Sequence, residues 1–360
     1  MIISPCILLL FSDFHFLRIT LILMTTFKTS AKRVAVQCLY RLGAPPLMRQ
    51  RGNSPETAVV LAYHSITNDT GYALPGIRIT PDLFARQVKH LAQHYTVLDL
   101  HRIVEIRSLG KPLPKRCVAV TFDDGYLDNY TNAFPVLAKY NMPATVFATV
   151  DPVLNSGRFW VSWLYEALQN PESIATANVV FGVSYSGRDA EGAFDAISAR
   201  LNHCSGEERH QLVEKFAGQV KGPPATGRML SRTQMLEMQA GGISFGSHTM
   251  THPILVNINA KERAQELQTS RELLSRALSR PVKILAYPNG RSITHNYDDD
   301  VINATKEAGH VAAVTSKRGP VQAGSDNFAL PRMGVSQQGG MARFALNLEL
   351  FRARSSRGKI

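Results

Sequence analysis

Two adjacent carboxylates at the end of an apolar segment are the first residues of this chain that could do chemistry. Residues 117–125 read Cys-Val-Ala-Val-Thr-Phe-Asp-Asp-Gly, so Asp123 and Asp124 follow a short, β-branched run. Such a run is typical of a strand buried on both faces, where a charge is costly unless it faces solvent, a metal or another charge. Gly125 would let the backbone turn so that both carboxylates line one rim. Taken alone, the pattern also fits a polar strand end followed by a turn.

Two histidines form the second cluster, about 120 residues later in the chain. Residues 247–253 read Ser-His-Thr-Met-Thr-His-Pro, which places His248 and His252 four residues apart. Imidazole suits Zn²⁺ and similar divalent ions, and a carboxylate from elsewhere would supply a third ligand. Pro253 interrupts helical hydrogen bonding, so we expect a short loop or a single turn, entered from a strand at Ile243–Phe245. A lone pair of this kind can be a surface coincidence, but combined with strand-end carboxylates it predicts a metal site.

Together, the two motifs resemble the polysaccharide deacetylase family, also called the NodB homology domain or carbohydrate esterase family 4. The resemblance extends over residues 58–336, and within the family it is strongest to the branch with an N-terminal Tyr-His motif, here Tyr63-His64. It implies a distorted (β/α) barrel with its site at the carboxyl ends of the strands. Weaker family elements occur in the expected order at 61–65, 134–137, 143–147, 286–290 and 330–332.

The resemblance implies a hydrolase that removes N-acetyl groups from the sugars of a polysaccharide or glycoconjugate, with an N-acetylated glycan as its partner. It assigns Asp124, His248 and His252 to one divalent metal ion and makes Asp123 the general base. Zinc is the expected ion, with cobalt, nickel or manganese as alternatives. The backbone N–H of Tyr126 would help to stabilise the oxyanion.

The sequence first departs from the best-known branch of the family at the general acid. That branch carries a late Leu-x-x-His motif, whose histidine protonates the departing amine. The only histidines after His252 are His295 and His310, and neither lies in that setting. His64 is the candidate instead, because it follows a strand-like run at 59–62 and would reach the same rim. The alternative role for His64 is to orient a metal ligand through a hydrogen bond.

The second departure from the family pattern concerns an arginine. The family commonly carries an arginine two residues before the proline of its third motif, but here Ala286 occupies that place. We expect Arg332, within Leu330-Pro331-Arg332, to pair with Asp123 in a bidentate fashion. An ordinary surface arginine is the alternative interpretation.

Alternating strand-like and helix-like segments support a parallel sheet. Apolar runs predict strands at 59–62, 118–122, 144–148, 243–245, 282–286 and 311–315, and helical spacing predicts helices at 81–94 and 261–278. Residues 151–232 form a helix-like insertion that contains Trp160 and Trp163. These tryptophans could stack on sugar rings, but we expect them to anchor the core of the insertion.

The formal net charge of +12 belongs mostly to the ends of the chain. Residues 53–351 carry 29 basic and 27 acidic side chains, so a nucleic-acid partner is not expected. We assign 1–52 to an apolar and basic leader, 53–340 to the catalytic domain and 341–360 to a basic tail. Such tails could contact a membrane surface peripherally. Residues 1–24 hold no clean 18-residue apolar span, so a transmembrane helix is not predicted, and translation beginning at Met24 would remove most of this segment.

The four cysteines show no paired spacing, which fits a reducing compartment. A cytoplasmic or membrane-peripheral location is therefore expected, with secretion left open. Two other functions remain: hydrolysis of a small non-sugar amide or O-acyl ester, and a catalytically silent glycan- or membrane-binding protein. The complete Asp-Asp-His-His set favours an enzyme, because binding alone needs no base beside a metal.

Overall fold

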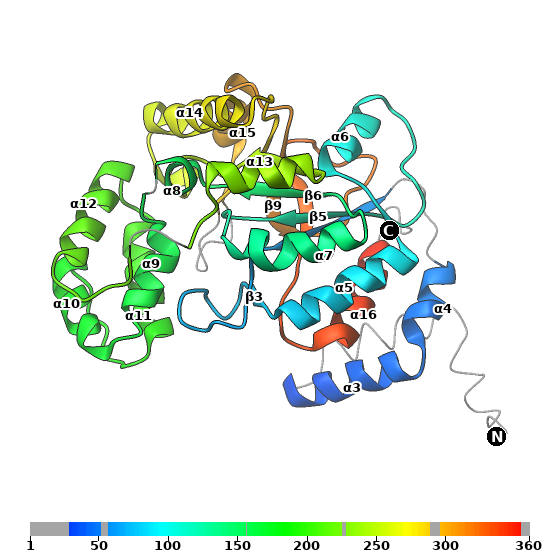
Figure 1. Cartoon of the computed structure of the whole chain (residues 1–360), viewed down its shortest axis with the longest axis horizontal. Helices are drawn as coiled ribbons and strands as arrows, with labels where there is room; N and C mark the ends of the chain where they lie inside the picture. The colour runs from blue at the N-terminus through cyan, green and yellow to red at the C-terminus, as the bar shows by residue number, and fades with distance from the viewer. Residues whose placement is uncertain (1–28, 52–56, 156, 225–227, 289–295, 354–360) are drawn as a thin grey trace.

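Seven parallel strands close into a barrel at the centre of the molecule (Figure 1). The computed structural model describes residues 29–51, 57–155, 157–224, 228–288 and 296–353. Around the barrel the strand order is β5, β6, β7, β8, β9, β10 and β1, and β1 pairs with β5 to close it. The bounds are β1 (Ala58–Tyr63), β5 (Cys117–Phe122), β6 (Ala144–Ala148), β7 (Ile243–Ser247), β8 (Ile284–Ala286), β9 (Ala312–Arg318) and β10 (Leu330–Gly334).

The register of the strands brings the predicted site residues to one edge. All six residues of β1 and of β5 are buried, and the two strands pair in parallel from Ala58 opposite Cys117 to Tyr63 opposite Phe122. His64 and Asp123 therefore leave the barrel side by side. On the other side of β5, β6 pairs with β7 up to Ala148 opposite Ser247. Because parallel strands end at the same edge, residues that follow β1, β5 and β7 meet there.

Short strands lie beside the barrel. β4 (Thr96–Val97) pairs with the first two residues of β5. The last two residues of β5 pair with β6 on the same side of the strand. β2 (Ser65–Ile66) and β3 (Arg78–Ile79) pair with each other directly after β1.

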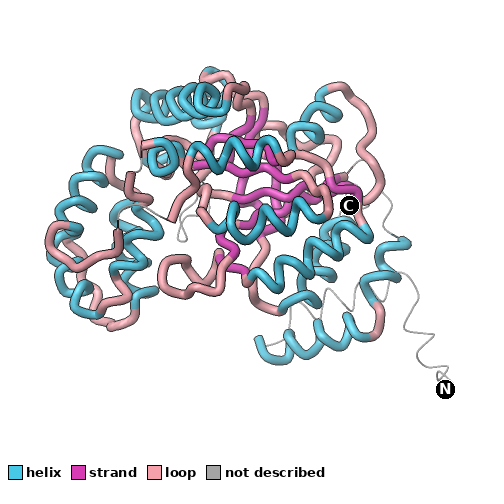
Figure 2. Tube along the Cα trace, in the orientation of Figure 1, coloured by secondary structure: helices cyan, strands magenta, loops and turns pink. Residues whose placement is uncertain are grey.

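Helices surround the strands (Figure 2). The predicted helix at 81–94 is α5, whose first turn contains Pro81 and is capped by the Thr80 hydroxyl. The predicted helix at 261–278 begins one residue earlier. The helices are α5 (Pro81–His94), α6 (Leu100–Ser108), a π-helix η2 (Asn129–Ala133), α7 (Phe134–Lys139), α13 (Arg232–Ala240), a 3₁₀ turn η3 (Leu255–Asn257), α14 (Ala260–Leu278) and α15 (Asp299–Glu307).

The insertion forms a helical lobe beside the barrel (Figure 1). It has a hydrophobic core of its own, in which Trp160 and Trp163 are both buried, and the Trp163 indole donates to the carbonyl of Pro223. The tryptophans thus anchor the lobe, as expected. The helices after β6 are α8 (Val150–Leu154), α9 (Trp160–Ala167), α10 (Pro171–Phe181), α11 (Ala190–Leu201) and α12 (Gly206–Ala217).

The C-terminal region differs from the sequence prediction. Residues 341–353 are not a basic tail but belong to a buried helix, α16 (Gly340–Ala353), because apolar residues cover nearly all of its faces. It packs against α3 (Thr29–Arg41) and α4 (Ala44–Arg51), within the segment predicted as a leader. Two of the terminal arginines are buried with Glu349: Arg49 Nε lies 2.9 Å and Arg352 NH1 2.8 Å from its oxygens. These two charges are therefore neutralised by Glu349 inside the fold.

No helix in the described residues is both long and apolar enough to cross a membrane. The apolar segment at 1–24 and Met24 lie outside the described residues.

Candidate metal centre and active site

The two carboxylates emerge from β5 through a tight backbone turn. Asp124 has φ +74° and Gly125 has φ +87°, so two successive residues lie in the left-handed region. That region is costly for a residue with a side chain, and such strain concentrates at functional sites. The amide of Asp123 donates to the carbonyl of Tyr63 at 2.9 Å, which ties the turn to the end of β1. The sequence pointed to Gly125 as the flexible residue, but Asp124 shares the unusual conformation.

The two histidines lie on the loop after β7, as the sequence predicted, and not on a helix. The amide of His248 donates to the carbonyl of Ala148 at 2.9 Å, which continues the pairing of β7 with β6. Thr249 and His252 both have positive φ, +67° and +60°, and the amide of His252 donates to the Thr249 hydroxyl at 3.1 Å. This folded loop turns both imidazoles toward Asp124.

Asp124, His248 and His252 converge on one point and are all buried. Asp124 Oδ1 lies 3.4 Å from His248 Nε2 and 3.5 Å from His252 Nε2, which is long for a hydrogen bond. Ligands bound about 2.0–2.1 Å from a tetrahedral zinc ion would lie about 3.3–3.4 Å apart. The donor set and its spacing therefore fit a divalent metal ion.

A hydrogen bond outside the cluster orients the first histidine. His248 Nδ1 lies 2.8 Å from the carbonyl oxygen of Ala286. A ligating imidazole usually donates its other N–H to such an acceptor, which leaves Nε2 with its lone pair toward the metal. Ala286, which stands where the family commonly has arginine, therefore contributes through its backbone.

The electrostatics of the cluster favour an ionised Asp124 and a neutral His252. Burial opposes ionisation of Asp124, but the neighbouring imidazoles, that of His248 first, hold its pKa below the usual value. Burial and the neighbouring His248 lower the pKa of His252 to about 3, so this imidazole is neutral at physiological pH. A neutral imidazole is the form that binds a metal.

Asp123 lies in a different environment, against Arg332 of β10. Arg332 NH1 and NH2 donate to the two oxygens of Asp123, each at 2.7 Å, and Arg332 Nε donates to the carbonyl of Thr315 at 2.9 Å. Burial alone would raise the pKa of Asp123, but the Arg332 guanidinium holds it far below its ordinary value. The structure thus brings together the pair that the sequence predicted, in bidentate geometry and not on the surface.

His64 completes the group. Its Nε2 lies 3.7 Å from Oδ2 of Asp123, and its side chain is only partly buried. All six residues singled out from the sequence thus lie at the carboxyl edge of the barrel. The place of His64 at the rim allows either role considered from the sequence: it could donate a proton or orient a metal ligand.

Two residues that the sequence reasoning missed hold the segment that carries His64. The buried carboxylate of Asp128 accepts hydrogen bonds from Ser65 Oγ at 2.5 Å, from the Ile66 amide at 2.8 Å and from the hydroxyl of Tyr72. Asn129 Nδ2 donates to the carbonyl of His64 at 2.7 Å. The loop that follows the two carboxylates therefore fixes the backbone of His64. The only sequence signal was that Asp128-Asn129 comes three residues after Gly125.

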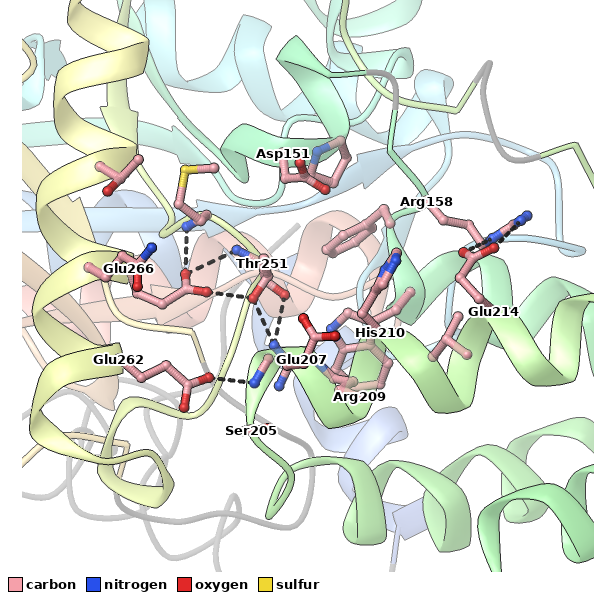
Figure 3. A pocket seen from close by; sticks show the side chains of 18 residues that line it. Asp151, Arg158, Ser205, Glu207, Arg209, His210, Glu214, Thr251, Glu262 and Glu266 are labelled. Carbon is pink, nitrogen blue, oxygen red and sulfur yellow. Dashed lines mark hydrogen bonds and ion pairs between the residues drawn. The ribbon is translucent and has the colours of Figure 1, made fainter.

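The loop before His252 is held by residues from two distant parts of the chain (Figure 3). Glu266 of α14 accepts from the amides of Met250 and Thr251, at 2.7 and 3.0 Å, and from the Thr251 hydroxyl at 2.6 Å. Arg209 of the insertion donates to the same hydroxyl at 2.8 Å. These contacts line a cavity of about 520 Å³ between α12 and α14. Nothing in the sequence around Glu266 or Arg209 signals these long-range bonds.

The remaining candidates are placed as follows. The Gly125 carbonyl accepts from the Leu230 amide and the Leu127 amide donates to the Arg228 carbonyl, both at 2.9 Å. These bonds fix the loop around Tyr126, whose amide as an oxyanion donor stays a prediction. His310 is buried beside α14, and burial lowers its pKa to about 4, consistent with a structural role. His295 lies outside the described residues.

Known polysaccharide deacetylases are similar to this chain in sequence. The sequence model of the polysaccharide deacetylase family matches residues 110–169 and 210–313, and the unmatched stretch falls in the helical insertion. The Bacillus subtilis protein YxkH, named as a candidate polysaccharide deacetylase, is 25% identical over 283 residues, which cover 78% of this chain and 72% of YxkH. The poly-beta-1,6-N-acetyl-D-glucosamine N-deacetylase of Staphylococcus epidermidis is 25% identical over 301 residues, covering 78% of this chain and 79% of that enzyme.

Solved structures share the fold. The Streptococcus pyogenes deacetylase PplD, in complex with acetate, superposes with a TM-score of 0.56 at 20% identity, covering 82% of this chain and 99% of PplD. IcaB from Ammonifex degensii gives a TM-score of 0.53 at 18% identity, with 83% and 97% coverage.

Proposed function

The chain belongs to the polysaccharide deacetylase family, a family of hydrolases that act on N-acetyl amide bonds, and we propose that it releases acetate from N-acetylated sugars of a polysaccharide or glycoconjugate with the help of one divalent ion. One observation carries the proposal: the Asp124, His248 and His252 cluster lies directly beside the Asp123–Arg332 pair. The relatives named as poly-N-acetylglucosamine deacetylases support a polymeric amino sugar as the substrate class.

In the proposed reaction, Asp124, His248 and His252 hold the ion, with zinc as the best match to one carboxylate and two imidazoles. When bound, the ion would polarise the amide carbonyl and lower the pKa of water to about 7. Asp123 accepts the proton of the attacking water. Its pairing with Arg332 keeps it ionised, and each of its oxygens retains a lone pair for the incoming proton.

The departing sugar amine must receive a proton, and His64 is the proposed donor. It lies at the rim beside Asp123, it is partly exposed, and its backbone is fixed by Asn129. The loop around Tyr126 would place the Tyr126 amide as a donor to the developing oxyanion. The products are acetate and a sugar with a free amine.

Acetate release from N-acetylglucosamine oligomers, measured with added Zn²⁺ or Co²⁺, tests the proposal. We expect turnover that disappears when the ion is chelated and returns when it is restored. The variant His248→Ala should lose both the metal and the activity, whereas His310→Ala, which changes a buried histidine outside the site, should keep the metal. Undiminished activity in His248→Ala would contradict the proposed centre.

A further inference from the structure

A second cavity, of about 330 Å³, opens at the rim beside His64. Its walls come from the ends of β1, β9 and β10 and from the first turns of α16. His64 lines this cavity and also lies 3.7 Å from Asp123, so this residue borders both the cavity and the proposed reaction centre. Its volume lies within the range of small-molecule binding sites.

The charge of this cavity is positive. Arg318 and Arg343 line it, together with the neutral polar Ser336, Gln338 and Asn347, and none of its described lining residues is an aspartate or a glutamate. The larger cavity behind the His252 loop has the opposite character, because five carboxylates line it (Figure 3). The positive charge is therefore a local property of the rim and does not follow from the overall basicity of the chain.

Arg343 differs from Arg158 and Arg107, two other half-buried arginines that have partners. Arg158 pairs with Glu214 at 2.8 Å, and Arg107 donates to the backbone carbonyls of Gln322 and Ser325. For Arg343, by contrast, no carboxylate lies within ion-pair distance in the described part of the chain. A partly buried charge without a counter-ion is costly, and a bound anion would offset that cost.

The backbone around Arg343 is built to hold its side chain. Gly339 has φ +81°, and a Cβ atom added there would lie 2.6 Å from Cβ and 2.8 Å from Cδ of Arg343. Only glycine lets this turn lie so close to the arginine side chain. The turn is anchored in addition by Gln337, whose Oε1 accepts from the Thr80 amide at 3.0 Å. The guanidinium carbon of Arg318, the other arginine of the cavity, lies 5.7 Å from the ring centroid of Phe351.

We propose, on the basis of the deacetylase function above, that this cavity binds an anionic group that the substrate carries next to the N-acetyl sugar being hydrolysed. Guanidinium groups bind carboxylate and phosphate oxygens in the same bidentate manner, so a uronate and a sugar phosphate share the required chemistry. Ser336, Gln338 and Asn347 can hydrogen-bond sugar hydroxyls beside the charge. The preferred substrate is therefore an acidic N-acetylated glycan or glycoconjugate, which should be hydrolysed more efficiently than a neutral homopolymer.

Kinetics on matched substrates test this inference. The substrates are the neutral tetramer of N-acetylglucosamine, a tetrasaccharide alternating N-acetylglucosamine with glucuronate, and N-acetylglucosamine 1-phosphate with N-acetylglucosamine as its neutral reference. We expect kcat/KM for one acidic substrate to exceed that for its neutral reference at least 10-fold, and the acidic substrate that shows it identifies the source of the charge. Arg343→Gln should reduce the preference about 10-fold, mainly through KM, because glutamine can still donate a hydrogen bond but lacks the charge.

Lys317→Gln is the matched control, because Lys317 is an exposed cation on β9 that does not line the cavity. It should leave the preference for the acidic substrate unchanged. Equal kcat/KM for the neutral and the acidic substrates would overturn the anion site. So would an Arg343→Gln variant that loses the same factor in kcat/KM on neutral and on acidic substrates.

Calorimetric binding of sodium glucuronate and of inorganic phosphate to the zinc-loaded protein separates this inference from the proposed function. Binding of either anion that is lost in Arg343→Gln but kept in Lys317→Gln supports the anion site, even if no substrate releases acetate and the deacetylase proposal fails. Deacetylation of the neutral tetramer without any Arg343-dependent anion binding overturns the anion site alone.

Discussion

The two halves of the rim balance their charges in different ways, although Asp123 and Asp124 are neighbours in the chain. In the base half, formed by Asp123, Arg332 and His64, the carboxylate is held by two hydrogen bonds of 2.7 Å from one guanidinium. In the metal half, formed by Asp124, His248 and His252, the carboxylate faces two imidazoles at 3.4 and 3.5 Å. The charge in the base half is thus balanced by one guanidinium, whereas the metal half has the spacing expected of ligands around a divalent metal ion.

The backbone explains how adjacent residues come to differ. Asp123 continues the pairing of β5 with β1 through its amide, and its side chain contacts Arg332 from β10. Asp124 takes a left-handed conformation, and its side chain contacts the loop after β7 instead. A single strained residue therefore separates the proposed work of proton transfer from that of metal binding.

Arg332→Lys should disturb the base half alone and give the larger effect. Lysine keeps the charge but cannot donate in a bidentate fashion, so Asp123 would lose its fixed orientation. We expect kcat at saturating zinc to fall about 100-fold, the size expected when a reacting group is misplaced. Zinc affinity, measured by competition with a chelator, should stay within a few-fold of the original protein.

Arg86→Lys serves as the control for this substitution, because Arg86 pairs with Asp82 on the exposed face of α5. It should leave both quantities unchanged. A loss of zinc affinity in Arg332→Lys that matches the loss of activity would show that the two halves are not separate.

Glu266→Gln should disturb the metal half alone. The glutamine cannot accept all three hydrogen bonds from Met250 and Thr251 as a carboxylate does, so the loop that carries His252 loosens. Substitution of groups that orient metal ligands typically costs 10–100-fold in affinity, and we expect about 10-fold weaker zinc binding here. With zinc in excess, kcat should return to within a few-fold of its original value.

Glu262→Gln is the matched control for Glu266→Gln, because Glu262 lies on the same helix and lines the same cavity but bonds the Gly206 amide of the insertion. Its zinc affinity should be unchanged. Equal weakening in the two variants would mean that the lobe as a whole, and not Glu266, supports the metal half.

The positions of His64, Asp123 and His248 could be predicted from the sequence because each follows an apolar run. The runs before His64, Asp123 and His248 became β1, β5 and β7, and parallel pairing then placed their carboxyl ends together. The helix at Pro81–His94 and the helical insertion were predicted on similar grounds, whereas the closure of the sheet into a barrel was implied by the family resemblance. Local pattern is enough where a strand end determines where a side chain lies.

Other features depend on contacts that no local pattern encodes. The strand β10 was not predicted, because Pro331 lies within it, and the structure places this proline at a register shift between Leu330 and Arg332. The supports from Asp128, Glu266 and Arg209 join residues that are 15 to 63 positions apart. The buried α16 was mistaken for a basic tail because its last residues and those beyond it are rich in arginine and lysine.

Zinc content after the same substitution at the two neighbouring carboxylates is the most direct test of the divided rim. Asp123→Asn and Asp124→Asn each replace one carboxylate by a neutral amide, at adjacent positions. Both variants can be assayed by elemental analysis and acetate release. We expect Asp123→Asn to keep one zinc ion per chain while its activity falls about 10²–10⁴-fold, the contribution typical of a general base. Asp124→Asn should lose the zinc itself. Equal zinc content in the two variants, or full activity in Asp123→Asn, would contradict the division.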